Sequence, residues 1–174
     1  MSLTQMNKKK GDVTHALLNL LNSSSQGGNQ FVTFNIGEEE YGIPIKSVQE
    51  ITAFRNLTHL PNTPSFVKGI LNLRGSVIPI MDPRTKFGMK EADNLKTSVI
   101  IIFKAVDKTI GMIVDRISDV LTIEQKNIEG TPDVSTEINT QFIQGIGKIN
   151  ERFIIILDIE KMFSRDELKF EGAA

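Results

Sequence analysis

The chain contains no cysteine and no tryptophan, and it has only one tyrosine and two histidines. Without cysteine it cannot form disulfides or thiolate metal sites. His15 and His59 have no second histidine at ligand spacing, so we expect neither a metal site nor another cofactor. With a net charge of −1 and few aromatic rings to stack on bases, the chain also lacks the usual features of a nucleic-acid-binding protein.

Long apolar stretches are missing as well. No run approaches the ~18 residues that a membrane-spanning helix needs. The apolar residues Ala16–Leu18 are followed at once by Asn19, so this stretch is too short for a signal peptide. We therefore expect a cytoplasmic protein that does not insert into a membrane.

The sequence also contains no complete catalytic motif. Residues 145–148 resemble part of a phosphate-binding loop, but Ile149 stands where that loop requires serine or threonine. The acidic run Glu38–Glu40 lies between two strand-like segments and is typical of a solvated turn. No Gly-x-Ser-x-Gly elbow occurs. These observations predict a protein that is not an enzyme.

The most informative feature that is present is an internal repeat. Residues 66–87 align without a gap on residues 142–163, which lie 76 positions later, and seven of the 22 positions are identical. Residues 31–51 align in the same way on residues 100–120, which lie 69 positions later. A repeat of this kind defines the architecture before any motif is considered. A residue that both copies keep is structural, whereas a residue that only one copy has needs another explanation.

The repeat divides the chain into segments. Copy one covers about residues 31–95 and copy two about residues 98–164, and together they form one domain over residues 31–164. Each copy alone is a marginal size for stable folding, so we expect the copies to fold against each other. Residues 1–30 are expected to form a flexible tail with apolar residues at the spacing of a short amphipathic helix, and residues 165–174 a C-terminal tail.

Alternating apolar residues predict an all-β fold with short helices, including a C-terminal helix. The expected strands, four in each copy, are residues 31–36, 41–45, 70–73, 77–81, 98–103, 110–114, 146–149 and 153–157. Residues 47–51 and 65–68 are expected to form short helical turns. Asp82, followed by Pro83, and its counterpart Asp158 are expected to cap short helices.

Two strands carry further expectations. Pro79 has no N–H for a strand ladder, so its strand is expected at a sheet edge, whereas the apolar residues 153–157 are expected to be buried. Arg74-Gly75 stands where copy two has Asn150-Glu151, so the turn alone does not require the arginine. Arginine offers a rigid, permanently charged set of donors, and Glu50 is its expected partner. The alternative is a solvated turn arginine.

Several motifs together resemble the CheW family, the coupling proteins of bacterial chemotaxis. They are Glu40-Tyr41-Gly42-Ile43-Pro44-Ile45, Val48-Gln49-Glu50-Ile51, Pro61-Asn62-Thr63-Pro64, Gly69-Ile70-Leu71-Asn72-Leu73-Arg74-Gly75 and Val114-Asp115-Arg116-Ile117. The resemblance implies two intertwined five-stranded SH3-like barrels. It also implies a non-catalytic cytoplasmic adaptor, monomeric on its own, that links the cytoplasmic tips of chemoreceptors to the regulatory domain of the histidine kinase CheA and is recruited to membrane-associated receptor arrays.

The same resemblance implies two sets of binding residues. The set that would face the kinase is Val32, Ile45, Val48, Asp133 and Val134. The set that would face the receptor, in a groove between the barrels, is Glu50, Gly69, Arg74, Val99, Gly111 and Ile117, with Glu50 paired to Arg74.

Three alternatives remain open at this point. The first is a coupler of the same fold in another receptor–kinase array, for example one that controls pili. The second is a small β-barrel protein that binds a ligand or carries out catalysis, which requires a polar pocket between the copies. The third is a fragment of the kinase, whose regulatory domain has the same fold.

Overall fold

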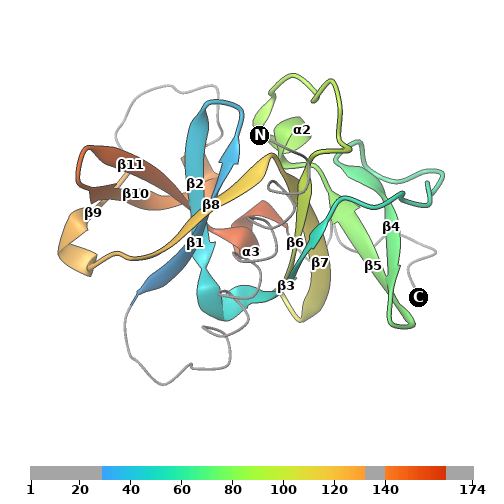
Figure 1. Ribbon diagram of the computed structural model, residues 1–174, viewed down its shortest axis with the longest axis horizontal. Helices are drawn as coiled ribbons and strands as arrows, with labels where there is room; N and C mark the ends of the chain where they lie inside the picture. Colours follow the sequence, from blue (N-terminus) through green and yellow to red (C-terminus); the bar gives the residue numbers. More distant parts are fainter. Residues whose placement is uncertain (1–28, 132–139, 164–174) are drawn as a thin grey trace, which may run out of the picture.

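Two β-barrels lie side by side in the computed structural model, which describes residues 29–131 and 140–163 (Figure 1). The β1 barrel has the strand order β8-β1-β2-β11-β10-β9, and the β3 barrel has the order β3-β6-β7-β5-β4. The strands of the β1 barrel are β1 (Gln30–Ile36), β2 (Glu39–Pro44), β8 (Arg116–Thr122), β9 (Ile128–Glu129), β10 (Ile143–Ile149) and β11 (Arg152–Leu157). The strands of the β3 barrel are β3 (Val48–Ala53), β4 (Val67–Leu73), β5 (Ser76–Met81), β6 (Val99–Ala105) and β7 (Lys108–Val114).

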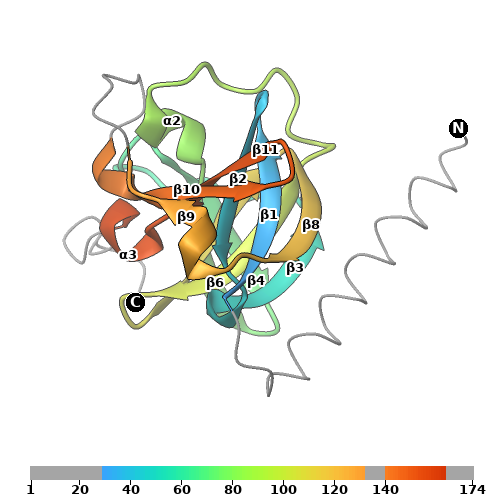
Figure 2. The same ribbon diagram turned by 90° about the vertical axis from the view of Figure 1, so that its left-hand side faces the viewer.

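The two copies exchange their first two strands. Strands β1 and β2 of copy one pair with β8 and β11 of copy two, while β6 and β7 of copy two pair with β3 and β5 of copy one. Figure 2, which faces the β1 barrel, shows β10 and β11 crossing β1 and β2. Neither barrel can therefore close with strands from one copy alone, which confirms the intertwined all-β fold. The β1 barrel has six strands where five were expected, because the short β9 pairs with β10.

Three apolar clusters fill the molecule. One lies inside the β3 barrel and includes Ile78, Ile100 and Ile102, and a second lies inside the β1 barrel and includes Ile154 and Ile156. The third and largest lies between the barrels and draws on both copies. Because successive residues of a strand point to opposite faces, a strand between a barrel interior and this central cluster is apolar on both faces, as β6 is.

Short helices close the ends of the strands. They are α2 (Pro83–Phe87), α3 (Ile159–Met162) and the 3-10 turns η1 (Ile45–Ser47), η2 (Gln125–Asn127) and η3 (Thr140–Phe142). Asp82 caps α2 by accepting a hydrogen bond from the Arg84 N–H, and Asp158 caps α3 by accepting one from the Lys161 N–H. Both caps predicted from the repeat are confirmed.

Two helical turns predicted from the sequence are wrong. Residues 47–51 lie mostly in β3, and the turn precedes them as η1. Residues 65–68 form a turn that leads into β4 at Val67, so Gly69 lies within a strand and does not end a helix. A bulge in β4 at this glycine brings the chain at Thr58 so close that a Cβ on Gly69 would lie 2.7 Å from the Thr58 carbonyl oxygen. Gly145 meets Glu129 in the same way in copy two, at 2.8 Å.

The prediction that Pro79 lies in an edge strand is wrong, because β5 lies between β4 and β7. However, β5 pairs with β7 only at Ile80 and Met81. In copy two the equivalent pairing begins one residue earlier, at Ile155. Proline has no N–H to donate, so Pro79 accounts for the missing pair.

The prediction that residues 153–157 are all buried is also wrong at its first residue. Phe153 is 62% exposed, whereas Ile154, Ile156 and Leu157 are buried. Phe153 lies next to the hairpin turn, on the face of β11 that carries Ile155 and Leu157 farther along the strand. The central cluster reaches those two residues but does not cover Phe153. Val77, its counterpart in copy one, is exposed for the same reason.

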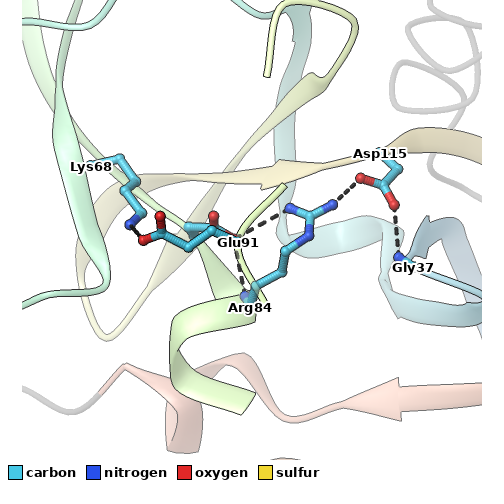
Figure 3. Close-up of polar contacts among 6 residues, drawn as sticks. Gly37, Lys68, Arg84, Glu91 and Asp115 are labelled. Carbon is cyan, nitrogen blue, oxygen red and sulfur yellow. Dashed lines mark hydrogen bonds and ion pairs between the residues drawn. The ribbon is translucent and has the colours of Figure 1, made fainter. Parts of the chain in front are cut away.

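A buried arginine ties the two copies together (Figure 3). Arg84 of α2 is only 4% exposed, and it donates hydrogen bonds to Asp82 on its own copy and to Asp115 at the corner between β7 and β8. Asp115 also accepts a hydrogen bond of 2.7 Å from the Gly37 N–H in the β1–β2 turn. This network was not predicted from the sequence, although Asp115 lies within the motif Val114-Asp115-Arg116-Ile117.

Some expectations fall on residues outside the described part of the chain. They are the amphipathic helix within residues 1–28, the kinase-facing residues Asp133 and Val134, and the C-terminal tail. Within the described ranges, no helix combines the length and the apolar character required to cross a bilayer.

Candidate functional site

The open end of the β3 barrel forms a groove of about 510 Å³. Ile78 and Ile102, which belong to the apolar cluster inside the barrel, lie at its floor. Its other lining residues come from β3, from the β4–β5 hairpin and from the start of β7: Gln49, Glu50, Leu73, Arg74, Ser76, Val77, Pro79, Lys108 and Thr109. The groove therefore combines an apolar floor with a polar rim.

Glu50 and Arg74 form an ion pair across this rim. The Arg74 Nη2 donates a hydrogen bond of 2.5 Å to the Glu50 Oε2, which confirms the predicted pairing. The Arg74 side chain is 77% exposed and the Glu50 side chain 24%. Because an exposed ion pair stabilises a fold by only about 0–1 kcal/mol, fold stability does not explain this arginine.

The backbone of Arg74 gives a second reason to look for a function. Its φ angle is +50°, in the left-handed region that glycine and asparagine tolerate best. Copy two has Asn150 at this position with a φ angle of +47°, so the turn accepts a residue suited to the conformation. Arginine costs about 1 kcal/mol more than such a residue. A strained residue that forms only an exposed ion pair is typical of a functional site.

An ion pair crosses the corresponding end of the β1 barrel. Arg152 takes the repeat position of Ser76, and Glu40 takes that of Thr109. Arg152 binds Glu40 through two hydrogen bonds of 2.5 and 3.3 Å and lies 3.8 Å from Asp119, the counterpart of Glu50. One barrel end therefore has an open groove, and the equivalent end of the other barrel has the Arg152–Glu40 ion pair, which we call the plug.

The electrostatics of the plug reflect this contact. Burial raises the pKa of the Glu40 carboxyl, but side-chain hydrogen bonds, led by the one from Arg152, lower it by more, so that the pKa lies below its ordinary value of 4.5. The hydrogen bond to Glu40 raises the pKa of Arg152 in turn. Both shifts favour the charged pair at neutral pH.

The structure separates the residues predicted to face the receptor. The resemblance implied a groove between the barrels, whereas the groove described above lies on the β3 barrel, and of these residues only Glu50 and Arg74 line it. Gly69, Val99 and Gly111 are buried, and Ile117 is partly buried against the central cluster. Gly111 lies at a close contact inside the β3 barrel, where a Cβ would collide with Ile80 and approach Ile100 to 3.0 Å. Substitution of these four residues would disturb packing within the fold, so any effect on a partner would be indirect.

The described residues predicted to face the kinase are also buried. Val32, Ile45 and Val48 are between 0% and 7% exposed and belong to the central cluster. Lys46 of η1, between Ile45 and Val48 in the chain, is exposed. It lines a pocket of about 240 Å³ whose other lining residues are Asn29, Gln30, Phe31, Pro44, Gln125, Ile128, Gln144 and Ile156. A partner at this end of the molecule would meet Lys46 and its polar neighbours first.

Sequence reasoning missed Ser76 and Thr109, which line the groove. The repeat contained the signal, since these small residues stand opposite Arg152 and Glu40. This signal could be interpreted only once the strand exchange was known. The exchange places Ser76 and Thr109 on neighbouring strands of the β3 barrel, and Arg152 and Glu40 on neighbouring strands of the β1 barrel.

Comparisons with known proteins agree with the fold. A family model described as the CheW-like domain matches residues 30–167. The chemotaxis protein CheW of Klebsiella aerogenes is 38% identical over 141 residues, which cover 81% of this chain and 85% of that protein. The probable chemotaxis protein CheW of Rhizobium etli is 38% identical over 145 residues, covering 83% and 94%. Among solved structures, the scaffolding protein TtCheW of Thermoanaerobacter tengcongensis matches with a TM-score of 0.73 and 36% identity, covering 82% of this chain and 92% of that one.

Proposed function

This chain belongs to the CheW-like domain family, and we propose that it is a non-catalytic adaptor that couples chemoreceptors to the histidine kinase CheA. It binds a receptor tip and the kinase's regulatory domain at the same time and takes no part in a chemical step. The observation that carries the proposal is the Glu50–Arg74 pair at the rim of an open, apolar-floored groove. Both copies have the turn, but only copy one places an arginine at its positive-φ position.

The receptor tip binds at this groove. The Arg74 guanidinium can donate several hydrogen bonds in one plane, which suits a carboxylate or a carbonyl oxygen of a partner. Glu50 holds the guanidinium in place before the partner arrives. Gly69, Val99, Gly111 and Ile117 support the groove from within the fold and contact the receptor little or not at all.

The kinase binds at the other predicted surface, around η1. Val32, Ile45 and Val48 support this surface from beneath, and the exposed Lys46 contacts the partner. Asp133 and Val134 form a second contact with the kinase. The adaptor remains in the cytoplasm and reaches the membrane-associated array through these two partners.

Signal transfer requires that the two surfaces be coupled. Receptor binding and kinase binding must change each other's affinity, typically by about 1–3 kcal/mol. The buried Arg84–Asp115 contact, which joins the two copies, provides a rigid connection between the barrels. The central cluster also connects the two barrels, over a larger area.

The substitution Arg74→Asn tests the receptor surface. It removes the charged rim group but retains a residue that copy two accommodates at the same φ angle, so the free energy of unfolding should stay equal or rise by up to about 1 kcal/mol. Receptor-dependent control of the kinase should fall strongly, and binding of the purified kinase should not change. The measurements are denaturant unfolding, kinase activity in receptor-containing membranes and kinase pull-down.

The exposed Lys126→Asn serves as the control for loss of a surface charge, because Lys126 is paired only to Glu124 on η2 and lies on the other barrel. Unchanged receptor-dependent control in Arg74→Asn would contradict the proposed receptor surface. Loss of folding in that variant would mean that Arg74 serves the fold.

A further inference from the structure

We propose that the groove of the β3 barrel receives one bulky apolar side chain of the receptor, and that Ser76, Thr109 and Pro79 keep the groove open for it. This inference rests on the proposed function and adds three residues to its site. It also gives a reason why the chain has one receptor site, although the repeat provides two equivalent barrel ends.

The floors of the two barrel ends differ in chemistry. In the β3 barrel, Ile102 lines the groove and is almost completely buried. Its counterpart in the β1 barrel is Thr33, which is fully buried and donates a hydrogen bond of 3.3 Å to the Asp119 carbonyl oxygen. The floor of the open groove is therefore apolar, whereas the equivalent floor of the β1 barrel belongs to a polar network. An apolar floor at the base of an accessible groove favours an apolar side chain.

The rims differ in size. Ser76 and Thr109 line the open groove, and Thr109 makes only a hydrogen bond of 3.4 Å with Gln49. Their repeat counterparts, Arg152 and Glu40, have long side chains that meet across the end of the β1 barrel. Both pairs occupy matching positions on matching strands, since Ile80 pairs with Gly111 as Ile156 pairs with Gly42. The side chains therefore differ in size at two otherwise equivalent barrel ends.

Pro79 enlarges the opening by acting on the backbone. The pairing of β5 with β7 stops at Ile80, one residue short of the equivalent pairing at Ile155. The β4–β5 hairpin is thereby free of β7 beyond this point, and Ser76, Val77 and Pro79 all line the groove. A groove of about 510 Å³ accommodates a large aliphatic or aromatic side chain together with the backbone that carries it.

The charged residues at the rim of the groove indicate which receptor groups lie next to that apolar side chain. The lining residues include two cations, Arg74 and Lys108, and one anion, Glu50, whose side chain is far less exposed than that of Arg74. The charged group of the Glu50–Arg74 pair that a partner meets first at this rim is therefore the exposed Arg74 guanidinium. The receptor segment should present an apolar side chain next to a carboxylate or an exposed carbonyl oxygen.

The double substitution Ser76→Arg with Thr109→Glu tests the inference by transferring the plug of the β1 barrel to the β3 barrel. We expect binding of a soluble receptor-tip fragment to weaken about 10- to 100-fold, because the apolar side chain loses its site. Kinase binding and the thermal midpoint should stay close to those of the unaltered chain. Calorimetric titration of the receptor fragment and pull-down of the kinase measure the two affinities.

The matched control is Arg152→Ser with Glu40→Thr, which removes the plug from the β1 barrel and should leave receptor binding at the β3 barrel unchanged. If the Ser76/Thr109 variant does not fold, Ser76→Arg alone repeats the test at an exposed position and should reduce receptor affinity by a smaller factor.

The possible results separate this inference from the proposed function. Undiminished receptor binding by the folded Ser76/Thr109 variant, together with weakened binding by Arg74→Asn, would overturn the inference and leave the proposed function standing. Undiminished binding by both variants would overturn both. Equal weakening by the Ser76/Thr109 variant and by the Arg152/Glu40 control would show an effect without specificity for the groove and would also overturn the inference.

Discussion

Arg74 and Asn150 show how one turn position can serve two purposes. Both residues adopt positive φ angles at the start of a two-residue hairpin turn. Asparagine suits this conformation because its short polar side chain can hydrogen-bond locally. Arginine gains nothing from the turn itself, and its ion pair with Glu50 is too exposed to offset the strain. The contact with a receptor that we propose for Arg74 would account for its presence.

Glu40 supports a prediction about pH. Because the folded state lowers the pKa of this carboxyl, the charged pair with Arg152 stabilises the fold above the ordinary pKa of 4.5, and that stabilisation is lost as the pH falls through the lowered value. The substitution Glu40→Gln should therefore reduce the thermal midpoint at neutral pH. The difference from the unaltered chain should shrink as the pH falls well below 4.5.

Glu91→Gln is the control for this prediction. Hydrogen bonding to Lys68 lowers the pKa of Glu91 as well, but Glu91 is fully exposed, so its substitution should change stability little at any pH. If Glu40→Gln lowered the thermal midpoint by the same amount in acid as at neutral pH, the Arg152–Glu40 pair would stabilise the barrel through packing and not through charge.

At the scale of the element, the two hairpins β4–β5 and β10–β11 have the same length and the same bulge position but different relations to their barrels. Strand β11 joins β2 at Ile155, whereas β5 joins β7 only from Ile80. Pro79, which has no N–H, accounts for the pair that β5 lacks at this end, whereas at the other end β5 gains a pair at Met81 that copy two does not have. The groove is therefore a property of the hairpin as well as of its side chains.

The substitution Pro79→Ile should allow β5 to pair with β7 at position 79, as β11 pairs with β2 at Ile155. The new amide at position 79 should become protected from hydrogen exchange as the β5–β7 pairing extends by one residue. The free energy of unfolding should change by less than about 1 kcal/mol, because the gained hydrogen bond and the lost rigidity of proline in the unfolded chain act in opposite directions. Receptor binding should weaken as the groove narrows.

Ile155→Val provides the reference for this measurement, since it alters the equivalent position of copy two and keeps the N–H. Its amide should stay protected and its receptor binding unchanged. A freely exchanging amide at position 79 would contradict our explanation of why β5 diverges from β7.

At the scale of the whole molecule, the exchange of strands makes each copy dependent on the other. The central cluster draws residues from both copies, and Arg84 of copy one is buried against Asp115 of copy two. Because the Asp115 side chain is 33% exposed, breaking the pair should cost less than the about 3–5 kcal/mol typical of a fully buried pair. We therefore expect the two barrels to unfold as one unit.

Division of the chain in the exposed loop before β6 tests this dependence. A fragment of residues 1–95 and a fragment of residues 96–174 should each fail to unfold cooperatively when alone, because β1 and β2 lack β8 and β11. Mixed in equal amounts, the fragments should recover the β-sheet circular dichroism and the cooperative transition of the intact chain. Cooperative unfolding of either fragment alone would contradict the interdependence of the barrels.

Much of this architecture can be predicted from local patterns. The hairpins follow from alternating apolar residues, and the caps of α2 and α3 follow from Asp82 and Asp158, because these features depend on neighbours in the chain. The Glu50–Arg74 pair follows from the difference between the copies. The strand assignments of β3 and β8 were missed, since a partly exposed strand such as β8 has a weak apolar pattern.

The repeat in the amino-acid order predicts that two similar β-units share one body and that the turn alone does not require Arg74. The exchange of strands, the burial of Val32, Ile45 and Val48, and the choice of which barrel end stays open emerge only in the folded chain. The physical reason is that these properties depend on contacts between residues far apart in the chain. Ser76 and Thr109 line one groove only because β5 lies beside β7 in the folded chain. In the same way, Arg152 and Glu40 can form their ion pair only because β11 lies beside β2.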